Sequence, residues 1–541
     1  MIANFARWFD RTILELGREF RWTYLPPLMV YLAAGVSGLT GIVGAFFVKD
    51  YLGLSAEFLA ALGFWIGIPW ALKMPLGHLV DLIWRYKFIL VYLGAGLIAA
   101  SLLIMIGLLA DPTAMAEVMS VEAWFVISEL LAPVGFVVQD VVADAMTVEA
   151  VPNVDDKGAP VDAATKRLMH TTMQTLGRVA IIGGGIFVSL LNVYMFGGVE
   201  SMDEATKIAT YIDIYLMALV IPVISVSGVI FGGWLKLRQY RALRNNGMNH
   251  IDAWGVIHTQ GEKPEPNWWI LGGSLVFVVF TLTLGLSDFE FNQEVIFLGS
   301  FSIVSFLMWR LMKVLDEDAR RVLLGTAIII FIFRATPSIG PGGSWWSIDV
   351  LKFDQQFFSV LSLISSTLTL LGMFIFRRFM AERSIAYIMV FLTLISTVLA
   401  LPNIAMYYGL HEWTASVTGG VVDARFIAVI NTAVESPLGQ VAMIPMLAWI
   451  ANSAPSHLKA TFFAVMASFT NLALSLSNLG TKYLNQIFSV SREIRDRATG
   501  EVQTPADYSE LGWLLIVASL IGLLAPLLAV WMVRQSRLKS A

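Results

Sequence analysis

Apolar runs of about 20 residues recur from one end of this chain to the other, and they decide what it can fold into. A helix of that length crosses the hydrocarbon core of a bilayer. The composition agrees, because 57% of the 541 residues are hydrophobic and only 14% are charged, against about 25% charged in soluble domains. The sequence therefore predicts an all-α protein that crosses a membrane many times.

The apolar runs predict about fourteen spans, bounded by charged residues. Six lie at about 24–48, 55–80, 88–109, 121–149, 167–195 and 208–235. Two follow at about 268–286 and 293–312, and six more at about 321–341, 354–376, 385–407, 425–451, 457–480 and 511–534.

Lysine and arginine gather in alternate connections, which places both termini in the cytoplasm by the positive-inside rule. We expect the plasma membrane, in bacteria the inner membrane, to hold the protein. The last outer connection, at about 481–510, opposes the rule because it also carries cations. We interpret that connection as a small solvated excursion.

An internal repeat divides the chain. The stretch 49–58 recurs as 348–357, with Asp, Leu and Phe at matching positions, and Ser55 of the first copy meets Asp354 of the second. Each copy is expected to cap the start of a second span. Parallel repeats of six spans are typical of the major facilitator fold. The predicted parts are an interfacial amphipathic helix (1–21), a first six-helix half (22–235), a middle loop with two inserted helices (236–319), a second six-helix half (320–535) and a cytoplasmic tail (536–541).

Carboxylates share one face of the fourth span. At about 100° per residue, Glu129, Asp140 and Asp144 fall together, whereas Glu149 lies opposite and near the membrane edge, where we set it aside. Charges inside hydrocarbon are expensive and usually face a bundle interior or a water-filled path. The stripe is therefore either a proton-coupling site or a set of buried structural partners of cations.

Cations of neighbouring spans lie at similar depths. Lys73 sits inside the second span, and Gln174 and Arg178 share a stripe on the fifth. We hypothesise a cluster of Lys73, Arg178 and the two aspartates in the cytoplasmic half of the first domain. It would serve either as an ion and anion site or as a neutralised structural network.

The second span ends in a candidate gate. Gly77, Asp81 and Arg85 follow the spacing of a loop signature of the major facilitator superfamily. The glycine would allow close helix approach, and Asp81 could engage a helix N-terminus or a cation. The alternative is an ordinary helix exit with cytoplasmic positive charges.

The second half is poorer in charge. Arg334 precedes a proline- and glycine-rich string at 336–343, which should break the helix, and Glu435 falls at similar depth. Arg334 and Glu435 could form a structural ion pair. If Glu435 pairs elsewhere, Arg334 is free to hold an anionic group of the solute. We expect Asn471 and Asn478 to hydrogen-bond helices together rather than contact solute.

Other chemistry is excluded by the residues present. The chain has no cysteine and its six histidines show no ligand spacing, so we expect neither a metal site nor a cofactor. There is no Gly-Lys-Ser/Thr phosphate loop, no nucleophile–base arrangement and no basic-aromatic patch for nucleic acid. An enzyme is therefore not expected.

Several stretches together resemble the folate–biopterin transporter family of the major facilitator superfamily. They are 46–55, Pro69-Trp70 with Lys73, Gly77 and Asp81, Asp140 to Asp144 with Glu149, 335–338, and 460–471. Two departures bear on the substrate more than on the fold: Met74 precedes Pro75, and the usual basic cluster is thinned to Arg85 and Lys87. The stretch from Gln139 is also similar to muropeptide and acetyl-CoA permeases.

The resemblance implies a secondary active transporter of a folate, a pterin or another small organic anion, working by alternating access of the two halves. It implies Lys73, Arg178 and Arg334 as candidates for binding a carboxylate of the solute, and Asp140 and Asp144 as proton-coupling residues. We also expect Gln174 to bind substrate and Glu129 and Glu435 to take part in proton coupling. We expect a monomer in the lipid bilayer. The alternatives are a related permease and a non-transporting assembly or pigment-handling factor of the same fold.

Overall fold

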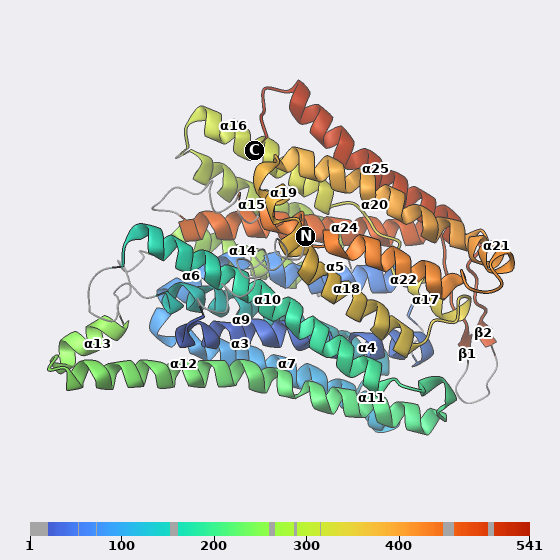
Figure 1. Ribbon diagram of the computed structural model, residues 1–541, viewed down its shortest axis with the longest axis horizontal. Coiled ribbons are helices and arrows are strands. Elements are labelled where there is room, and N and C mark those ends of the chain that lie inside the picture. The colour runs from blue at the N-terminus through green and yellow to red at the C-terminus, as the bar shows by residue number, and fades with distance from the viewer. Residues whose placement is uncertain are drawn as a thin grey trace, which may run out of the picture.

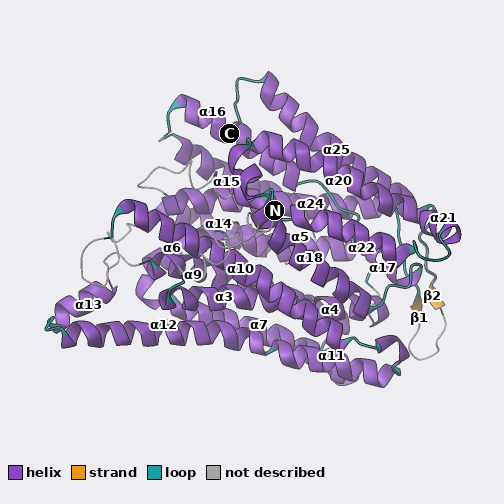
Figure 2. Cartoon of the chain, viewed as in Figure 1, coloured by secondary structure: helices purple, strands orange, loops and turns teal. Residues whose placement is uncertain are grey.

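The computed structural model is almost wholly helical over the residues it describes (Figures 1 and 2). These residues are 20–51, 54–71, 73–151, 161–258, 266–285, 289–313, 315–446, 449, 459–495 and 502–540. The interfacial helix predicted at 1–21 lies almost entirely outside them.

The first six predicted spans correspond to the helices up to residue 245. They are η2 (Trp22–Tyr24), α3 (Leu25–Val36), η3 (Ser37–Thr40), α4 (Gly41–Tyr51), α5 (Ala56–Ala71), α6 (Lys73–Leu82), η4 (Trp84–Tyr86), α7 (Phe88–Ala110), α8 (Pro112–Val118), α9 (Val121–Ala150), α10 (Ala163–Met195), η5 (Val199–Ser201), α11 (Glu204–Ala218) and α12 (Val220–Asn245). The last two follow one another along one edge of the molecule (Figure 1).

The remaining helices form the middle segment and the second half. They are α13 (His250–His258), α14 (Trp268–Gly285), α15 (Asn292–Met312), α16 (Glu317–Arg334), α17 (Gly342–Asp349), α18 (Gln355–Ile375), α19 (Arg377–Glu382), α20 (Ile385–Tyr407), α21 (Leu410–Val417), α22 (Ala424–Glu435), η6 (Ser436–Leu438), α24 (Lys459–Ile487) and α25 (Leu511–Gln535). The strands β1 (Ile494–Arg495) and β2 (Val502–Thr504) pair antiparallel in the connection before α25.

Eleven helical stretches within the described residues are long and apolar enough to cross a membrane. They include every predicted span except those at 293–312, 321–341 and 457–480. Helices α15, α16 and α24 occupy those three places and have 21, 18 and 29 residues. The multi-span architecture is confirmed, and the count of fourteen stays a prediction.

The repeat predicted two equivalent helix starts, and both are capped as expected. The Phe58 amide donates to the Ser55 hydroxyl at 3.0 Å, and the Phe357 amide donates to the Asp354 carboxylate at 2.6 Å. Each bond satisfies an amide that has no partner within its helix. The helix break predicted in the second half also occurs, since α16 ends at Arg334 and Gly340 takes a left-handed φ of 71°.

The two predicted halves contact each other reciprocally. Helix α5 packs on α24, and α10 packs on α18, so the second span of each half meets the fifth span of the other. Amide side chains join the first pair, because Asn478 donates to the Gly63 carbonyl at 2.8 Å and Asn471 donates to the Trp70 carbonyl at 3.2 Å. The expectation for these two asparagines is confirmed, while the domain boundaries stay a prediction.

Candidate functional site

A cationic side chain bridges two carboxylates inside the first half. Lys73 Nζ lies 2.6 Å from Asp140 Oδ2 and 2.8 Å from Asp144 Oδ2. Local sequence explains the placement, because α5 carries Pro69 and ends at Ala71, and α6 begins at Lys73 within one apolar run. Tyr31 of α3 donates its hydroxyl to Asp144 Oδ1 at 2.7 Å. Three helical segments, α3, α6 and α9, therefore meet at one ion-pair cluster.

The side chains of the two aspartates differ in exposure. The side chain of Asp140 is 19% exposed and that of Asp144 is 39% exposed. Both share Lys73, but Asp144 also accepts from Tyr31. Asp144 is therefore the more accessible of the two carboxylates.

Arg178 completes the cluster electrostatically. It lies close enough to Asp140 to interact with the charge of that carboxylate, yet it makes no hydrogen bond or ion pair with any described residue. Gly177, one position earlier, fixes α10 against α3, since a Cβ there would lie 3.0 Å from the Tyr31 ring. The structure thus brings together the four residues expected in the cluster and leaves Arg178 available to an anion. The side chain of Gln174 lies outside those described.

Glu149 is the residue that sequence reasoning missed. Its carboxylate lies 2.6 Å from Lys87 Nζ and 3.3 Å from Lys236 Nζ. Lys87 is fully buried, with its ammonium 3.5 Å from the centroid of the Trp84 ring. Helices α7, α9 and α12 are tied together by this second cluster. Glu149 lies on the opposite helical face from the acidic stripe, so the sequence alone gave no reason to include it. Its two partners, Lys87 and Lys236, are distant in sequence, and only the structure shows that they reach it.

The remaining predicted charges are not brought into the cluster. Glu129 is largely enclosed near Tyr215 and forms no ion pair within the described part of the chain. Arg334 does not pair with Glu435; its guanidinium instead faces the sulfurs of Met443 and Met446 at 3.8 and 3.6 Å. Sulfur is a weak acceptor, so these contacts leave the hydrogen-bonding capacity of Arg334 largely unused.

The candidate gate is only partly described. A Cβ on Gly77 would meet no described atom within 4 Å, so no described helix approaches this glycine closely. Arg85 is exposed, and its guanidinium lies 5.9 Å from the ring centroids of both Tyr86 and Trp254. The Asp81 side chain lies outside those described. The gating roles therefore stay predictions.

Most described residues of the connection before α25 are exposed, as expected of a solvated excursion, but one of its cations is buried. Arg492 is 2% exposed, donates to the Val48 carbonyl of α4 and lies 5.0 Å from the Trp345 ring centroid. The connection is held to the second half by hydrogen bonds from Tyr508 to Asp349 and from Tyr407 to the Tyr508 carbonyl. The buried Arg492 joins this connection to α4, so protein groups rather than water surround its charge.

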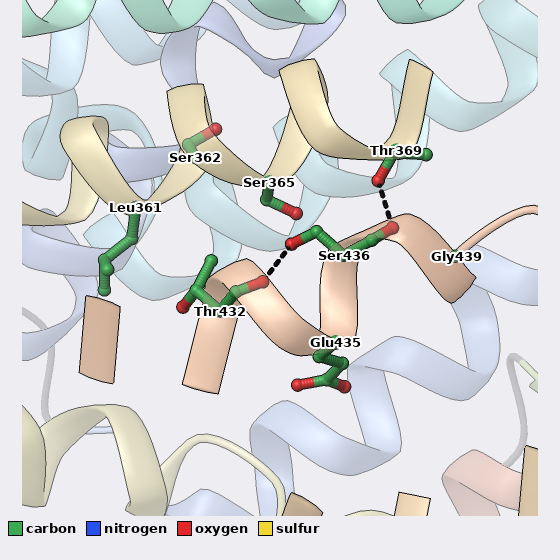
Figure 3. A pocket seen from close by; sticks show the side chains of 8 residues that line it. All are labelled: Leu361, Ser362, Ser365, Thr369, Thr432, Glu435, Ser436 and Gly439. Atoms are coloured by element: carbon green, nitrogen blue, oxygen red, sulfur yellow. Dashed lines mark hydrogen bonds between the residues drawn. The ribbon is translucent and has the colours of Figure 1, made fainter. Parts of the chain in front are cut away.

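A cavity of about 400 Å³ opens in the second half between α18 and the α22–η6 turn (Figure 3). Five of its lining residues carry hydroxyl groups and one carries a carboxylate; the lining residues are Leu361, Ser362, Ser365, Thr369, Thr432, Glu435, Ser436 and Gly439. Sequence reasoning singled out Glu435 but none of the hydroxyls. Serine and threonine are common in apolar helices, and only packing shows which of them face a cavity.

A model of the BT1 family matches residues 34–540. The chain belongs to the BT1 family. Its curated relatives include a "Folate-biopterin transporter" of Synechocystis sp., 22% identical over 477 residues that make up 87% of this chain and 76% of the relative. A "Putative folate transporter 2" of Plasmodium berghei is 24% identical over 169 residues, 30% of this chain and 34% of the relative.

Solved structures similar to this BT1-family chain are transporters. An auto-inhibited peptide transporter of the POT family matches with a TM-score of 0.55 and 15% identity, over 97% of this chain and 98% of its own. A POT family transporter in complex with a thioalcohol-conjugated peptide matches with a TM-score of 0.54 and 11% identity, over 95% and 96% of the two chains. These likenesses confirm the predicted major facilitator fold. The BT1-family chain is a multi-span membrane transporter of a small molecule and not an enzyme.

Proposed function

We propose that this BT1-family protein is a secondary active transporter of a folate or pterin-like organic anion, driven by protons and working by alternating access. The observation that carries the proposal is Lys73 held between Asp140 and Asp144, with Arg178 beside them and free of ion pairs among the described residues. The relative named as a folate-biopterin transporter supports the choice of solute.

The cluster suggests how a proton and an anion would be linked. Protonation of Asp144, the more exposed aspartate, removes one of the two negative charges that Lys73 neutralises. The local charge then becomes more positive, which favours an anionic solute group near Arg178. Loss of the solute would favour release of the proton by the same coupling.

Alternating access is supported by the closed outer side. Arg492 joins the second half to Val48 of the first, and Gln486 of α24 donates to Glu57 of α5 at 2.6 Å. Opening to the outside requires both contacts to break, so this conformation corresponds to an outward-closed state of the cycle. We place both termini in the cytoplasm and the protein in the plasma membrane.

The test is uptake of labelled folate, pterin and small organic acids into proteoliposomes, with and without an inward proton gradient. We expect Asp144→Asn to abolish gradient-driven uptake at unchanged protein incorporation, and exposed Asp252→Asn on α13 to serve as the matched control. Unchanged uptake by Asp144→Asn would contradict the coupling role. Uptake of none of these solutes by the wild-type protein would contradict the proposed substrate class.

A further inference from the structure

The cavity beside η6 contains both used and unused polar groups. Thr369 donates to the Ser436 carbonyl at 2.9 Å, and Ser436 donates to the Thr432 carbonyl at 2.5 Å, as the dashed lines in Figure 3 show. Ser362 shares a hydrogen bond of 2.8 Å with Ser189 of α10. These three hydroxyls hold the walls of the cavity together, and each donates or shares a hydrogen bond within the protein.

Three other groups on the cavity wall have no hydrogen-bond or ion-pair partner among the described residues. The hydroxyls of Ser365 and Thr432 and the carboxylate of Glu435 make no hydrogen bond or ion pair with any side chain or backbone group that the structure describes. Glu435 is exposed although it lies in the middle of the apolar stretch Ala424–Met446, and it lines this cavity. A carboxylate so placed is costly inside a membrane protein unless a ligand or water satisfies it.

The cavity lies at nearly the same depth as Arg178. Helices α10 and α18 run antiparallel, with Ser189 bonded to Ser362 and a Cβ on Gly185 lying 3.3 Å from the Ser366 hydroxyl. Continuing this register places Arg178 opposite position 373 of α18. That position is about 6 Å along the helix from Thr369, at a rise of 1.5 Å per residue.

Arg178 and Glu435 therefore belong to opposite halves and lie at a similar depth in the membrane. Thr369 bonds to Ser436, the neighbour of Glu435, so Glu435 shares the depth of Thr369. Arg178 suits a carboxylate end of a solute, whereas Glu435 suits a group that donates hydrogen bonds. A solute with both kinds of end would contact both halves at once.

We propose that the cavity binds the hydrogen-bond-donating edge of the solute: a planar ring carrying an amino group next to a ring N–H, as in a 2-amino-4-oxopteridine. Two parallel N–H groups match the two oxygens of Glu435, which can only accept when ionised. Ser365 and Thr432 supply adaptable hydroxyls for the ring heteroatoms. This inference rests on the proposed function, and it assigns Glu435 to solute recognition rather than to proton coupling.

The test compares pterin with lumazine, in which a carbonyl replaces the 2-amino group. Binding to the purified full-length protein in nanodiscs is measured by equilibrium dialysis without any proton gradient. We expect the wild-type protein to prefer pterin, and Glu435→Gln to weaken pterin about 10- to 100-fold, the effect of losing a charge-assisted hydrogen bond. Lumazine binding should change by less than about threefold.

Two further variants keep the test decisive. Exposed Glu412→Gln on α21 controls for removal of a carboxylate and should bind pterin as the wild type does. Thr432→Val removes one hydroxyl at nearly constant volume and should weaken pterin severalfold even if Glu435→Gln fails to fold.

The outcomes separate this inference from the proposed function. Wild-type protein that binds neither folate nor pterin would contradict the proposed function itself. Wild-type protein that binds pterin and lumazine equally would overturn only the inference. So would a Glu435→Gln protein that keeps pterin affinity and loses proton-driven uptake, since that result would return Glu435 to a coupling role.

Discussion

Replacing Lys73 by methionine tests whether the ion-pair cluster stabilises the fold, drives transport, or does both. Methionine keeps the length of the side chain but removes the ammonium that lies 2.6 and 2.8 Å from two carboxylates. Each contact is worth about 6 kcal/mol by Coulomb's law at an effective dielectric constant of about 20. Desolvation of the charges offsets much of this, and removal of one partner of a buried pair costs about 3–5 kcal/mol in measured cases.

We therefore expect Lys73→Met to lower the free energy of unfolding by about 3–5 kcal/mol. Most of the loss should come from Asp140, because the Asp144 side chain is 39% exposed and solvent screens its charge. The double variant Lys73→Met/Asp140→Asn should recover most of the stability. It leaves one aspartate, which keeps its hydrogen bond from Tyr31 at 2.7 Å.

Equilibrium unfolding in mixed micelles, followed by tryptophan fluorescence, measures the stability of all three proteins. Lys73→Met protein as stable as wild type, or a double variant no more stable than the single one, would refute the electrostatic reasoning. Proton-driven uptake by the stable double variant then decides between the two roles left open by the sequence. Lost uptake supports coupling, and retained uptake supports a structural network.

Two further perturbations test packing and closure. Gly35→Ala should lower the unfolding midpoint, with a cost of about 1–3 kcal/mol for overpacking, because its Cβ would overlap the Ile181 carbonyl oxygen of α10. The control Gly38→Ala should keep the wild-type midpoint, because its Cβ would meet no described atom within 4 Å. Equal midpoints for the two variants would contradict the close α3–α10 approach. Arg492→Ala should loosen the outer closure and speed labelling, by a membrane-impermeant maleimide, of a cysteine replacing Phe46. The chain has no cysteine of its own, so labelling has no background, and unchanged rates would contradict the role of Arg492.

Helix starts and polar helix contacts were the most predictable parts of the fold. Ser55 and Asp354 could be identified as caps because a cap bonds within three residues of itself. Asn471 and Asn478 could be expected to join helices because an amide inside hydrocarbon needs a partner. Depth counting also brought Lys73 to the level of the aspartates, since helical rise is constant.

Pairings between distant segments were less predictable. Arg334 and Glu435 were expected to pair because they fall at similar depth, yet they do not. Depth along a helix does not tell on which side of the helix a side chain lies. Glu149 was set aside for its helical phase, although Lys87 and Lys236 reach it from two other helices. Arg492 looked solvated in a charged loop, but tertiary packing buries it against Trp345.

The sequence by itself determined that this chain crosses a membrane repeatedly and that it resembles the folate–biopterin transporter family. These conclusions depend on run length, periodicity and local motifs, all of which act over short distances along the chain. Only the tertiary structure decided which charges meet, which remain free and where a cavity opens. Lys73 and Asp140 lie 67 positions apart, and the orientation of whole helices, set by the packing of every other side chain, brings them into contact.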